Sequence, residues 1–242
     1  TFIYTLHFLW HRVLPKISGL SALYYTISRG RNQVITRAEI IGRLHFCGFH
    51  FIDFKRIGDN HWFIARKTKV PAVDRNPSFG PLITLPRIGY GGKIFQLYKF
   101  RTMHSYAEYL QDFVYETCQL DDRGKFKDDF RLTQWGKVMR KYWLDELPQI
   151  INYVRGDIRL LGVRAISAHY FSLYPKDVQQ LRIQFKPGLV PPYYADLPKN
   201  FTEIVESERN YLLAKKRAPF RTDVIYFARA LKNIVLKKAR SG

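Results

Sequence analysis

The stretch Leu144-Asp145-Glu146-Leu147-Pro148-Gln149 places two adjacent carboxylates next to a proline. Because proline has no backbone N–H, it is tolerated in the first turn of a helix, where that donor has no partner. The run 150–154, Ile-Ile-Asn-Tyr-Val, predicts a short buried helix that ends at Gly156. We therefore expect Asp145 and Glu146 at a helix N-terminus, where the helix dipole favours negative groups, including a metal-bound phosphate.

Two interpretations of this carboxylate pair are open. The pair could hold a divalent cation and leave one oxygen free to attack phosphorus. Alternatively, Asp145 is a helix cap and Glu146 an ordinary first-turn glutamate, an arrangement that is common at helix starts. The dipeptide alone does not decide between these interpretations, and the surrounding motifs provide further evidence.

Further motifs flank the carboxylate pair on both sides. They are Gly80-Pro81, Arg87-Ile88-Gly89, Gly92-Lys93-Ile94-Phe95, Lys99-Phe100-Arg101-Thr102-Met103, Asp129-Phe130-Arg131-Leu132-Thr133, Gly136, Arg140-Lys141, Gly156-Asp157, Leu160-Leu161-Gly162-Val163-Arg164, Arg182 and Pro187-Gly188. In this order and spacing the chain resembles the bacterial sugar transferases, also called monotopic phosphoglycosyl transferases. The resemblance covers about residues 76–195.

The resemblance implies a two-step exchange at a membrane. Members of the family move a phosphosugar from a nucleotide diphosphosugar, here expected to be a UDP-sugar, to a polyprenyl phosphate, which initiates bacterial surface glycan synthesis. The position of Asp145 implies the nucleophile, which would form a covalent aspartyl phosphosugar, and that of Glu146 implies a ligand of Mg²⁺. Physical chemistry agrees, since an ionised carboxylate is a competent nucleophile and Mg²⁺ neutralises phosphate oxygens.

Basic residues near the pair are candidates for binding the phosphates. Arginine offers a planar bidentate fork to phosphate and lysine a point charge. Asp157 is a further candidate, which either orients an arginine or caps the turn at Gly156. The alternative for the cations is that they are surface charges of a very basic chain. The basic candidates are Lys99, Arg101, Arg131, Arg140, Arg164 and Arg182.

The sequence departs from the family around Arg164. The family commonly has Gly-Pro-Arg-Pro where this chain has Gly162-Val163-Arg164-Ala165. Without the two prolines, φ is free at two positions of a loop that is expected to direct the arginine. We expect retained chemistry with an altered sugar pocket or acceptor loop, and a catalytically inactive protein of the same fold is the alternative.

Composition limits the classes of protein to consider. The 242 residues include 40 Lys and Arg against 20 Asp and Glu, a formal net charge of +20. Such an excess favours anionic partners, either nucleic acid, phosphorylated substrates or an acidic membrane surface. Cys47 and Cys118 form no metal or disulfide motif, which favours a reducing compartment.

The expected contact with the membrane does not depend on a membrane-spanning segment. No stretch reaches about 18 uninterrupted apolar residues. The family usually places an apolar re-entrant helix before its Gly-Pro motif, whereas residues 67–77 here are a polar, proline-containing linker. The aromatic segment 2–10 and the apolar segment 20–27, with basic flanks, could replace it, or could form an ordinary core helix pair.

A second candidate for the membrane contact is the C-terminal segment 223–240. It has Val224, Ala228, Leu231 and Val235 at helical spacing among Arg and Lys residues. A helix packed on the domain with a solvated basic face is the alternative. We expect the cytoplasmic face of the bacterial inner membrane as the location.

The predicted architecture is α/β or α+β, with helices around a small sheet and one face on the membrane. Residues 1–75 form the expected accessory segment and residues 76–242 the catalytic domain. Within the former, Thr36 should cap a helix through Arg43, followed by a strand at 46–52 and a return strand at 61–66. This helix and hairpin faintly resemble the end of a methyltransferase-like domain, and could be its remnant.

Aromatic residues at 106, 109, 113 and 115 follow helical spacing and are interpreted as packing residues, not as a platform for stacking bases. We expect no nucleic-acid partner. The alternatives to the enzyme are a basic nucleic-acid-binding protein and an inactive membrane-bound scaffold.

Overall fold

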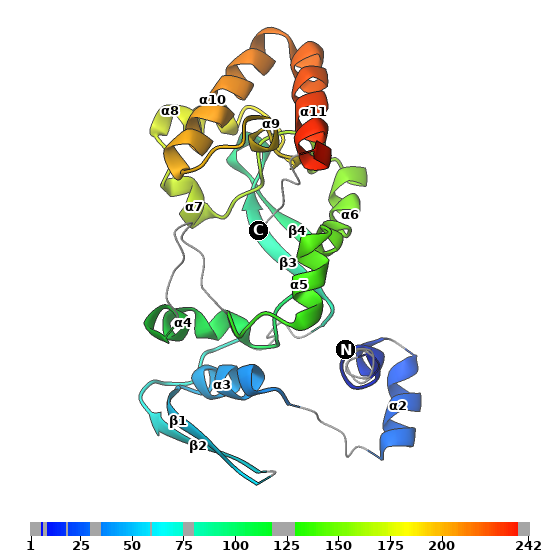
Figure 1. Cartoon of the computed structure of the whole chain (residues 1–242), viewed down its shortest axis with the longest axis vertical. Coiled ribbons are helices and arrows are strands. Elements are labelled where there is room, and N and C mark those ends of the chain that lie inside the picture. The colour runs from blue at the N-terminus through cyan, green and yellow to red at the C-terminus, as the bar shows by residue number, and fades with distance from the viewer. Residues whose placement is uncertain are drawn as a thin grey trace. The chain divides into compact units, whose positions relative to one another are not determined.

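The computed structural model describes residues 6, 9–17, 19–29, 35–58, 60–74, 80–117 and 129–236. The chain divides into two compact units, one of Thr1–Pro81 and Arg101–Met139 (unit 1) and one of Leu82–Phe100 and Arg140–Gly242 (unit 2) (Figure 1). Parts of four predictions lie outside the described residues, namely most of segment 2–8, Cys118, linker residues 75–77 and the C-terminal residues 237–240. The predicted domain boundary at residue 75 stays a prediction.

Unit 1 begins with a pair of short helical segments. The wide turn η1 (Leu9–Val13) runs into the 3₁₀ turn η2 (Leu14–Lys16), and the α-helix α2 (Leu20–Ser28) follows. Tyr24 of α2 is buried between them, with His11 Nδ1 3.0 Å from its hydroxyl. In the described residues, the apolar segment 20–27 is helical, and the turns η1 and η2 precede it.

A helix and a hairpin follow in unit 1, as the sequence predicts. The helix α3 (Arg37–Phe46) is capped by Thr36, whose Oγ accepts a hydrogen bond from the Glu39 N–H at 3.3 Å. The antiparallel strands β1 (Phe49–Ile57) and β2 (Asn60–Lys67) form the hairpin. The helix extends through Phe46, three residues beyond its predicted end, so the strand begins at Phe49 instead of 46.

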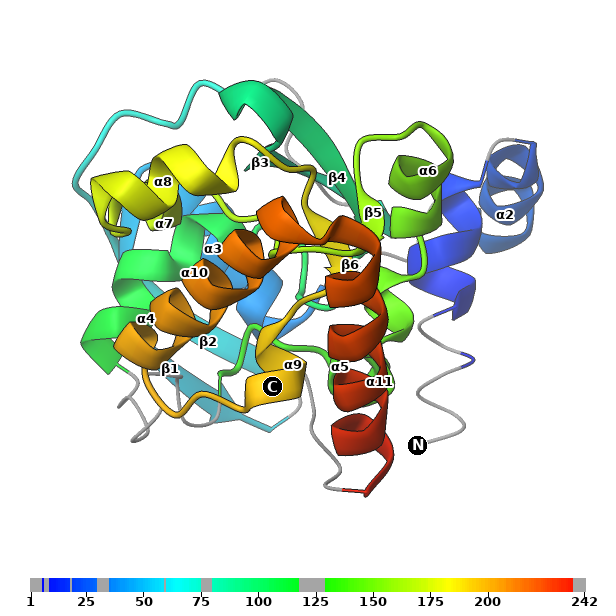
Figure 2. The same ribbon diagram turned by 90° about the horizontal axis from the view of Figure 1, so that it is seen from above.

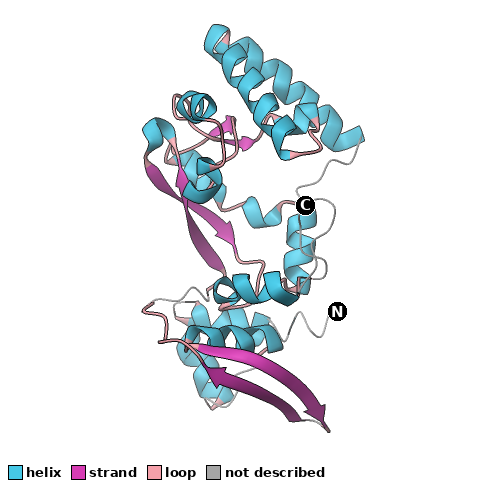
Figure 3. Ribbon diagram, turned by 90° about the vertical axis from the view of Figure 1, so that its left-hand side faces the viewer, coloured by secondary structure: helices cyan, strands magenta, loops and turns pink. Residues whose placement is uncertain are grey.

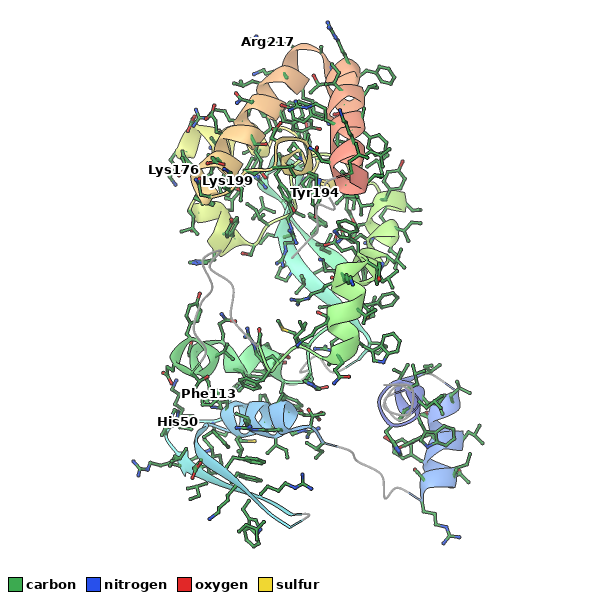
Figure 4. All side chains as sticks on the ribbon, in the orientation of Figure 1. His50, Phe113, Lys176, Tyr194, Lys199 and Arg217 are labelled. Atoms are coloured by element: carbon green, nitrogen blue, oxygen red, sulfur yellow. The ribbon has the colours of Figure 1, made fainter. Side chains whose placement is uncertain are left out.

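The core of unit 1 joins this helix and hairpin to a later part of the chain. The 3₁₀ turn η4 (Ala107–Leu110) continues into α4 (Gln111–Thr117), and α5 (Gln134–Lys141) follows. Phe113 of α4, labelled in Figure 4, packs against Phe51 of β1 with ring centroids 5.7 Å apart. The packing interpretation of the aromatic residues 106–115 is confirmed except at Tyr115, whose side chain is exposed.

Unit 2 is built on a hairpin and a crossover. The antiparallel strands β3 (Leu82–Ile88) and β4 (Ile94–Phe100) are joined by the turn η3 (Tyr90–Gly92). Short parallel strands β5 (Arg159–Leu161) and β6 (Gly188–Val190) flank the helices α7 (Ala168–Ser172) and α8 (Lys176–Arg182). Figure 3 shows the strands as separate pairs, and the described strands form three two-stranded sheets. The predicted mixed helix-and-strand class is confirmed, with three small sheets in place of one.

Three helices complete unit 2. The short α9 (Tyr193–Asp196) packs against the hairpin of α10 (Phe201–Arg217) and α11 (Pro219–Leu236) (Figure 2). Lys215 of α10 is buried, and its Nζ contacts the carboxylate of Asp223 in α11 at 2.8 Å. The ion pair closes the hairpin near its turn.

The helix α11 packs on unit 2 through its less apolar face. Thr222, Ala230 and Asn233 are buried, and the Asn233 side-chain amide donates to the carbonyls of Tyr194 and Ala195 at 3.0 and 2.9 Å. An apolar stripe at helical spacing is exposed instead, and Phe220 within it is 83% exposed. We call this set the α11 stripe; it consists of Phe220, Val224, Phe227, Leu231 and Val235.

The described residues contain no helix that is both long enough and apolar enough to cross a membrane.

Two glycines allow the backbones next to β5 and in β6 to approach each other closely. A Cβ at Gly162 would lie 2.8 Å from the Gly188 nitrogen, and one at Gly188 would collide with the Gly162 backbone. The Gly188 N–H meanwhile donates to the Val163 carbonyl at 2.9 Å. Because the obstacles are backbone atoms, the strands would have to separate to admit any side chain. These glycines fix the start of the loop that carries Arg164.

We expect Gly188→Ala to lower the free energy of unfolding by about 3 kcal/mol, because overpacking against backbone has no inexpensive relaxation. Gly156→Ala is the matched control. At Gly156 a Cβ has space, and only the left-handed backbone at φ 76° opposes it, so about 1 kcal/mol is expected. Urea denaturation of both variants measures the difference, and equal losses would contradict the close approach.

Candidate functional site

The two adjacent carboxylates lie on a 3₁₀ turn of unit 2. This turn, η5 (Leu144–Glu146), follows Trp143, whose left-handed backbone at φ 55° turns the chain. The helix α6 (Gln149–Val154) begins only after Pro148, which is its N-cap residue. The prediction that Asp145 and Glu146 start this helix is therefore wrong by one turn, because a separate turn precedes the proline. The predicted end of the helix at Gly156, with φ 76°, is confirmed.

The helix α6 is not buried as predicted. Its apolar residues face outward, and Val154 is 80% exposed, whereas Gln149 and Asn152 are buried. The reason is the hydrogen bonding of Asn152. Its Oδ1 accepts from the Tyr98 N–H at 2.9 Å, and its Nδ2 donates to the Gln96 carbonyl at 2.7 Å. Asn152 thus pairs with the free edge of β4 and turns the polar side of α6 inward.

Lys99 of β4 lies next to both carboxylates. Its Nζ is 2.6 Å from Glu146 Oε1 and 3.6 Å from Asp145 Oδ2. The three side chains are largely buried, and that of Asp145 is 10% exposed. Low exposure strengthens the attraction between an ammonium and two carboxylates and also limits the access of water. Lys99 was a sequence candidate, and the structure places it with the carboxylate pair.

Arg164 also lies near Glu146. Its Nη2 is 3.9 Å from Glu146 Oε1, its Nη1 donates to the Tyr193 hydroxyl at 2.9 Å, and its side chain is 45% exposed. Desolvation lowers the pKa of Arg164, but Tyr193 and Glu146 outweigh it and hold this pKa above its ordinary value. The structure thus gathers Lys99, Asp145, Glu146 and Arg164 into one group, which we call the charged cluster.

A second guanidinium lies near the charged cluster. Burial, and then the charge of Arg164, lower the pKa of Arg87 in β3. A guanidinium whose pKa is lowered by a neighbouring cation favours an anion nearby. Arg87 belongs to a predicted motif, but the sequence did not single it out for phosphate binding.

The predicted roles of Arg140 and Asp157 in unit 2 stay predictions. Arg140 is half-buried in the last turn of α5, and its carbonyl accepts from the Trp143 N–H at 3.3 Å. Asp157 Oδ2 accepts from Asn152 Nδ2 at 3.0 Å and lies 3.9 Å from Arg155 Nε. Asp157 therefore orients Asn152, an interaction that neither sequence interpretation included.

Arg182 lies behind Arg164 instead of beside the carboxylates. It is buried in the last turn of α8 and forms an ion pair with Glu208 of α10. Its Nη2 also donates to the backbone carbonyl of Arg164 at 2.7 Å. Burial raises the pKa of Glu208, and Arg182 opposes that shift.

The remaining candidates, Arg101 and Arg131, belong to unit 1. Arg101 Nε donates to the Gly80 carbonyl at 2.7 Å. Arg131 is buried and donates from Nε and Nη2 to the two oxygens of Asp129 at 2.9 and 2.8 Å, and from Nη1 to Gln111 at 2.7 Å. Their predicted role in phosphate binding stays a prediction.

Sequence reasoning missed Asn152, Tyr193 and Glu208. Asn152 carried a signal, since it is a polar residue inside an apolar run. Glu208 carried none, because its partner Arg182 is 26 residues away along the chain.

The carboxylate pair fits a Mg²⁺ ion that arrives with phosphate. Mg²⁺ prefers oxygen ligands and takes one or two protein carboxylates, with phosphates and water completing its octahedron. Asp145 and Glu146 supply such oxygens on one turn. In the described part of the chain, no group of three or more His, Cys, Asp or Glu residues could hold a metal ion by itself.

The chain resembles named proteins over part of its length. It is 36% identical over 138 residues to the galactosyl transferase CpsE of Streptococcus agalactiae, covering 55% of this chain and 30% of the relative. It is 36% identical over 108 residues to the undecaprenyl-phosphate galactose phosphotransferase of Salmonella typhimurium, covering 43% and 22%. A UDP-N-acetylgalactosamine-undecaprenyl-phosphate N-acetylgalactosaminephosphotransferase of Aeromonas hydrophila is 34% identical over 100 residues, covering 41% and 21%.

Less than a third of the length of each of these relatives is therefore matched. The family model of the bacterial sugar transferases matches residues 72–237, which include the whole charged cluster. The chain belongs to the bacterial sugar transferase family.

Proposed function

We propose that this protein transfers a phosphosugar from a nucleotide diphosphosugar, most simply a UDP-sugar, to a polyprenyl phosphate such as undecaprenyl phosphate, and so initiates surface glycan synthesis. Membership of the family and the names of the Salmonella and Aeromonas relatives support this assignment. The observation that carries it is the charged cluster, in which Lys99 lies within 3.6 Å of both carboxylates and Arg164 lies beside Glu146. Phosphoryl transfer needs such a combination of nucleophile and fixed cations.

In the proposed reaction, a carboxylate oxygen of Asp145 attacks the phosphorus attached to the sugar. The bond from that phosphorus to the nucleoside monophosphate breaks, and the nucleoside monophosphate leaves with the electron pair. An oxygen of the polyprenyl phosphate then attacks the same phosphorus and releases the Asp145 carboxylate. Lys99 and Arg164 stabilise the charge on the phosphate oxygens in both steps.

Glu146, with Asp145 next to it, would hold the Mg²⁺ ion. When bound, Mg²⁺ neutralises the phosphate oxygens and orients the leaving group. The short contact of Glu146 with Lys99 supports this proposal, because it holds the carboxylate next to a cation that is proposed to bind the diphosphate. Lys99 can contact a phosphate oxygen when the diphosphate is bound, since its ammonium has three donors.

We expect Asp145→Asn to reduce turnover by roughly a thousandfold or more, because an amide is not a nucleophile. Intact-protein mass spectrometry with a panel of UDP-sugars should show a phosphosugar adduct on the wild type and none on the variant. Asp177→Asn is the control, since that carboxylate lies on the surface of unit 2 and pairs with Arg209. Full activity of Asp145→Asn would rule out the proposed nucleophile.

Glu146→Gln should mainly change the metal requirement. We expect the Mg²⁺ concentration for half-maximal activity to rise roughly tenfold, since a neutral amide is a poorer ligand than a carboxylate. A Mg²⁺ titration of initial rates, with nucleoside monophosphate release as the signal, measures this shift. An unchanged titration curve would argue against Glu146 as a metal ligand.

We further propose that the α11 stripe rests on an anionic membrane at the cytoplasmic face. Five apolar side chains at helical spacing are exposed there, and Arg221 and Lys232 are exposed on the same helix. Apolar residues flanked by basic ones bind at the boundary between headgroups and acyl chains. A surface of this kind would bring unit 2 to its lipid acceptor.

We expect Val224→Glu combined with Leu231→Glu to weaken binding to phosphatidylglycerol-containing vesicles by roughly tenfold or more. The two apolar side chains would no longer enter the membrane, and the added negative charge would be repelled by the anionic lipid. Leu213→Glu is the control, since it places a charge at an exposed leucine of α10. Vesicle sedimentation measures the binding. Equal losses in both proteins would contradict a contact through α11.

A further inference from the structure

The loop that presents Arg164 combines buried and exposed residues. Val163, Ala165 and Ile166 are buried, whereas Arg164 between them is exposed. The carbonyl of Val163 accepts from the Gly188 N–H at 2.9 Å, and that of Ile166 accepts from the Ile88 N–H at 3.0 Å. The loop is thus anchored by backbone hydrogen bonds on each side of Arg164.

The carbonyl of Arg164 itself is held by a side chain. Arg182 Nη2 donates to it at 2.7 Å, and Nη1 of the same guanidinium pairs with Glu208. The guanidinium also lies over the ring of Tyr174, with Cζ 4.7 Å from the ring centroid. The Arg182 and Glu208 side chains are only 5% and 1% exposed. This guanidinium is therefore held by three partners, Glu208 of α10, the Arg164 carbonyl and the ring of Tyr174, which lies between α7 and α8.

A planar guanidinium is well suited to this task. It offers several donors in a rigid fork, so one arginine can bridge a carboxylate and a carbonyl. A lysine in the same place could keep the ion pair, but its single ammonium on a flexible chain would not hold both partners in this geometry. Arg182→Lys is therefore a conservative variant that keeps the positive charge of the bridge and loses its geometry.

We infer that Arg182 is a positioning residue, which, held by Glu208, fixes the Arg164 backbone so that the Arg164 guanidinium meets the phosphates of the donor. This inference rests on the proposed function, in which Arg164 binds the diphosphate. In the family's Gly-Pro-Arg-Pro motif, two prolines would restrict the backbone on each side of the arginine. Here we infer that the ion pair of Arg182 and Glu208 restricts it instead. The earlier expectation that Arg182 binds phosphate itself is replaced by an indirect role.

The test uses Arg182→Lys, which leaves Glu208 with a cationic partner and is expected to stay folded. Hydrogen exchange of the peptide spanning residues 162–168, without any substrate, reports on the loop. We expect faster exchange in the variant, because the Arg164 carbonyl loses its partner. With a UDP-sugar as the donor, we expect KM to rise roughly tenfold and kcat to change less than about threefold, the pattern for lost donor binding.

The matched control is Asp223→Asn, which weakens a different ion pair of unit 2, between the buried Lys215 and Asp223. It should lower the melting temperature and leave both the exchange of 162–168 and the donor KM unchanged. A parallel loss of donor binding in this control would mean that general destabilisation explains the effect, and would overturn the inference.

Glu208→Gln distinguishes positioning from direct phosphate binding. Positioning predicts a weaker affinity for UDP, because Arg182 loses its counter-charge and its fixed orientation. Direct binding predicts an unchanged or tighter affinity, because the guanidinium is released from Glu208. Calorimetric titration measures the affinity for UDP. An unchanged or tighter affinity would overturn the inference.

The two proposals fail in different ways. If the wild type forms no phosphosugar adduct and releases no nucleoside monophosphate, the proposed function fails, and the exchange measurement still decides whether Arg182 fixes the loop. Unchanged exchange in Arg182→Lys overturns the positioning role even in a fully active enzyme. Faster exchange with an unchanged KM overturns its connection to the donor.

Discussion

The geometry of the candidate site depends on how the free edge of β4 is satisfied. In unit 2 this strand pairs with β3 on one side only, and unpaired backbone groups that are buried are costly. Asn152 supplies an acceptor to Tyr98 and a donor to Gln96, in the manner of a neighbouring strand. Because Lys99 follows Tyr98 directly, the same contact brings its ammonium to the turn that carries the two carboxylates. Asp157 completes the arrangement by accepting from Asn152.

A similar constraint explains why two helices of unit 2 expose apolar residues. In both α6 and α11 a buried asparagine, Asn152 or Asn233, hydrogen-bonds to backbone groups of a neighbouring element. A buried amide must keep its partners, since leaving it unpaired costs about 1–3 kcal/mol. The apolar side chains on the opposite face are then left to the surface. Helical spacing in the sequence identifies such an amphipathic helix, but it does not say which of the two faces packs inward.

Local features of the fold were predictable and long-range ones were not. The Thr36 cap, the hairpin after it and the stop at Gly156 follow from residues a few positions apart, so the sequence alone predicts them. The carboxylate pair and Lys99 were predicted as candidates from the family-like motifs. Their mutual distances were not, because Lys99 and Glu146 are 47 residues apart and meet through the packing of η5 and α6 on β4. The extra turn before Pro148 escaped prediction, since it depends on the left-handed backbone of Trp143.

An arginine in a loop such as that around Arg164 can be held in place in two physical ways. A proline restricts φ at its own residue, and therefore acts locally and in the unfolded chain as well. The bridge from Arg182 acts only after α8 and α10 have packed, since Glu208 belongs to α10. A buried ion pair of this kind contributes specificity of geometry more than net stability, because desolvation offsets much of the attraction. The direction of Arg164 is therefore coupled to the integrity of the helices behind it, and changes remote from the carboxylates can reach the site through that pair.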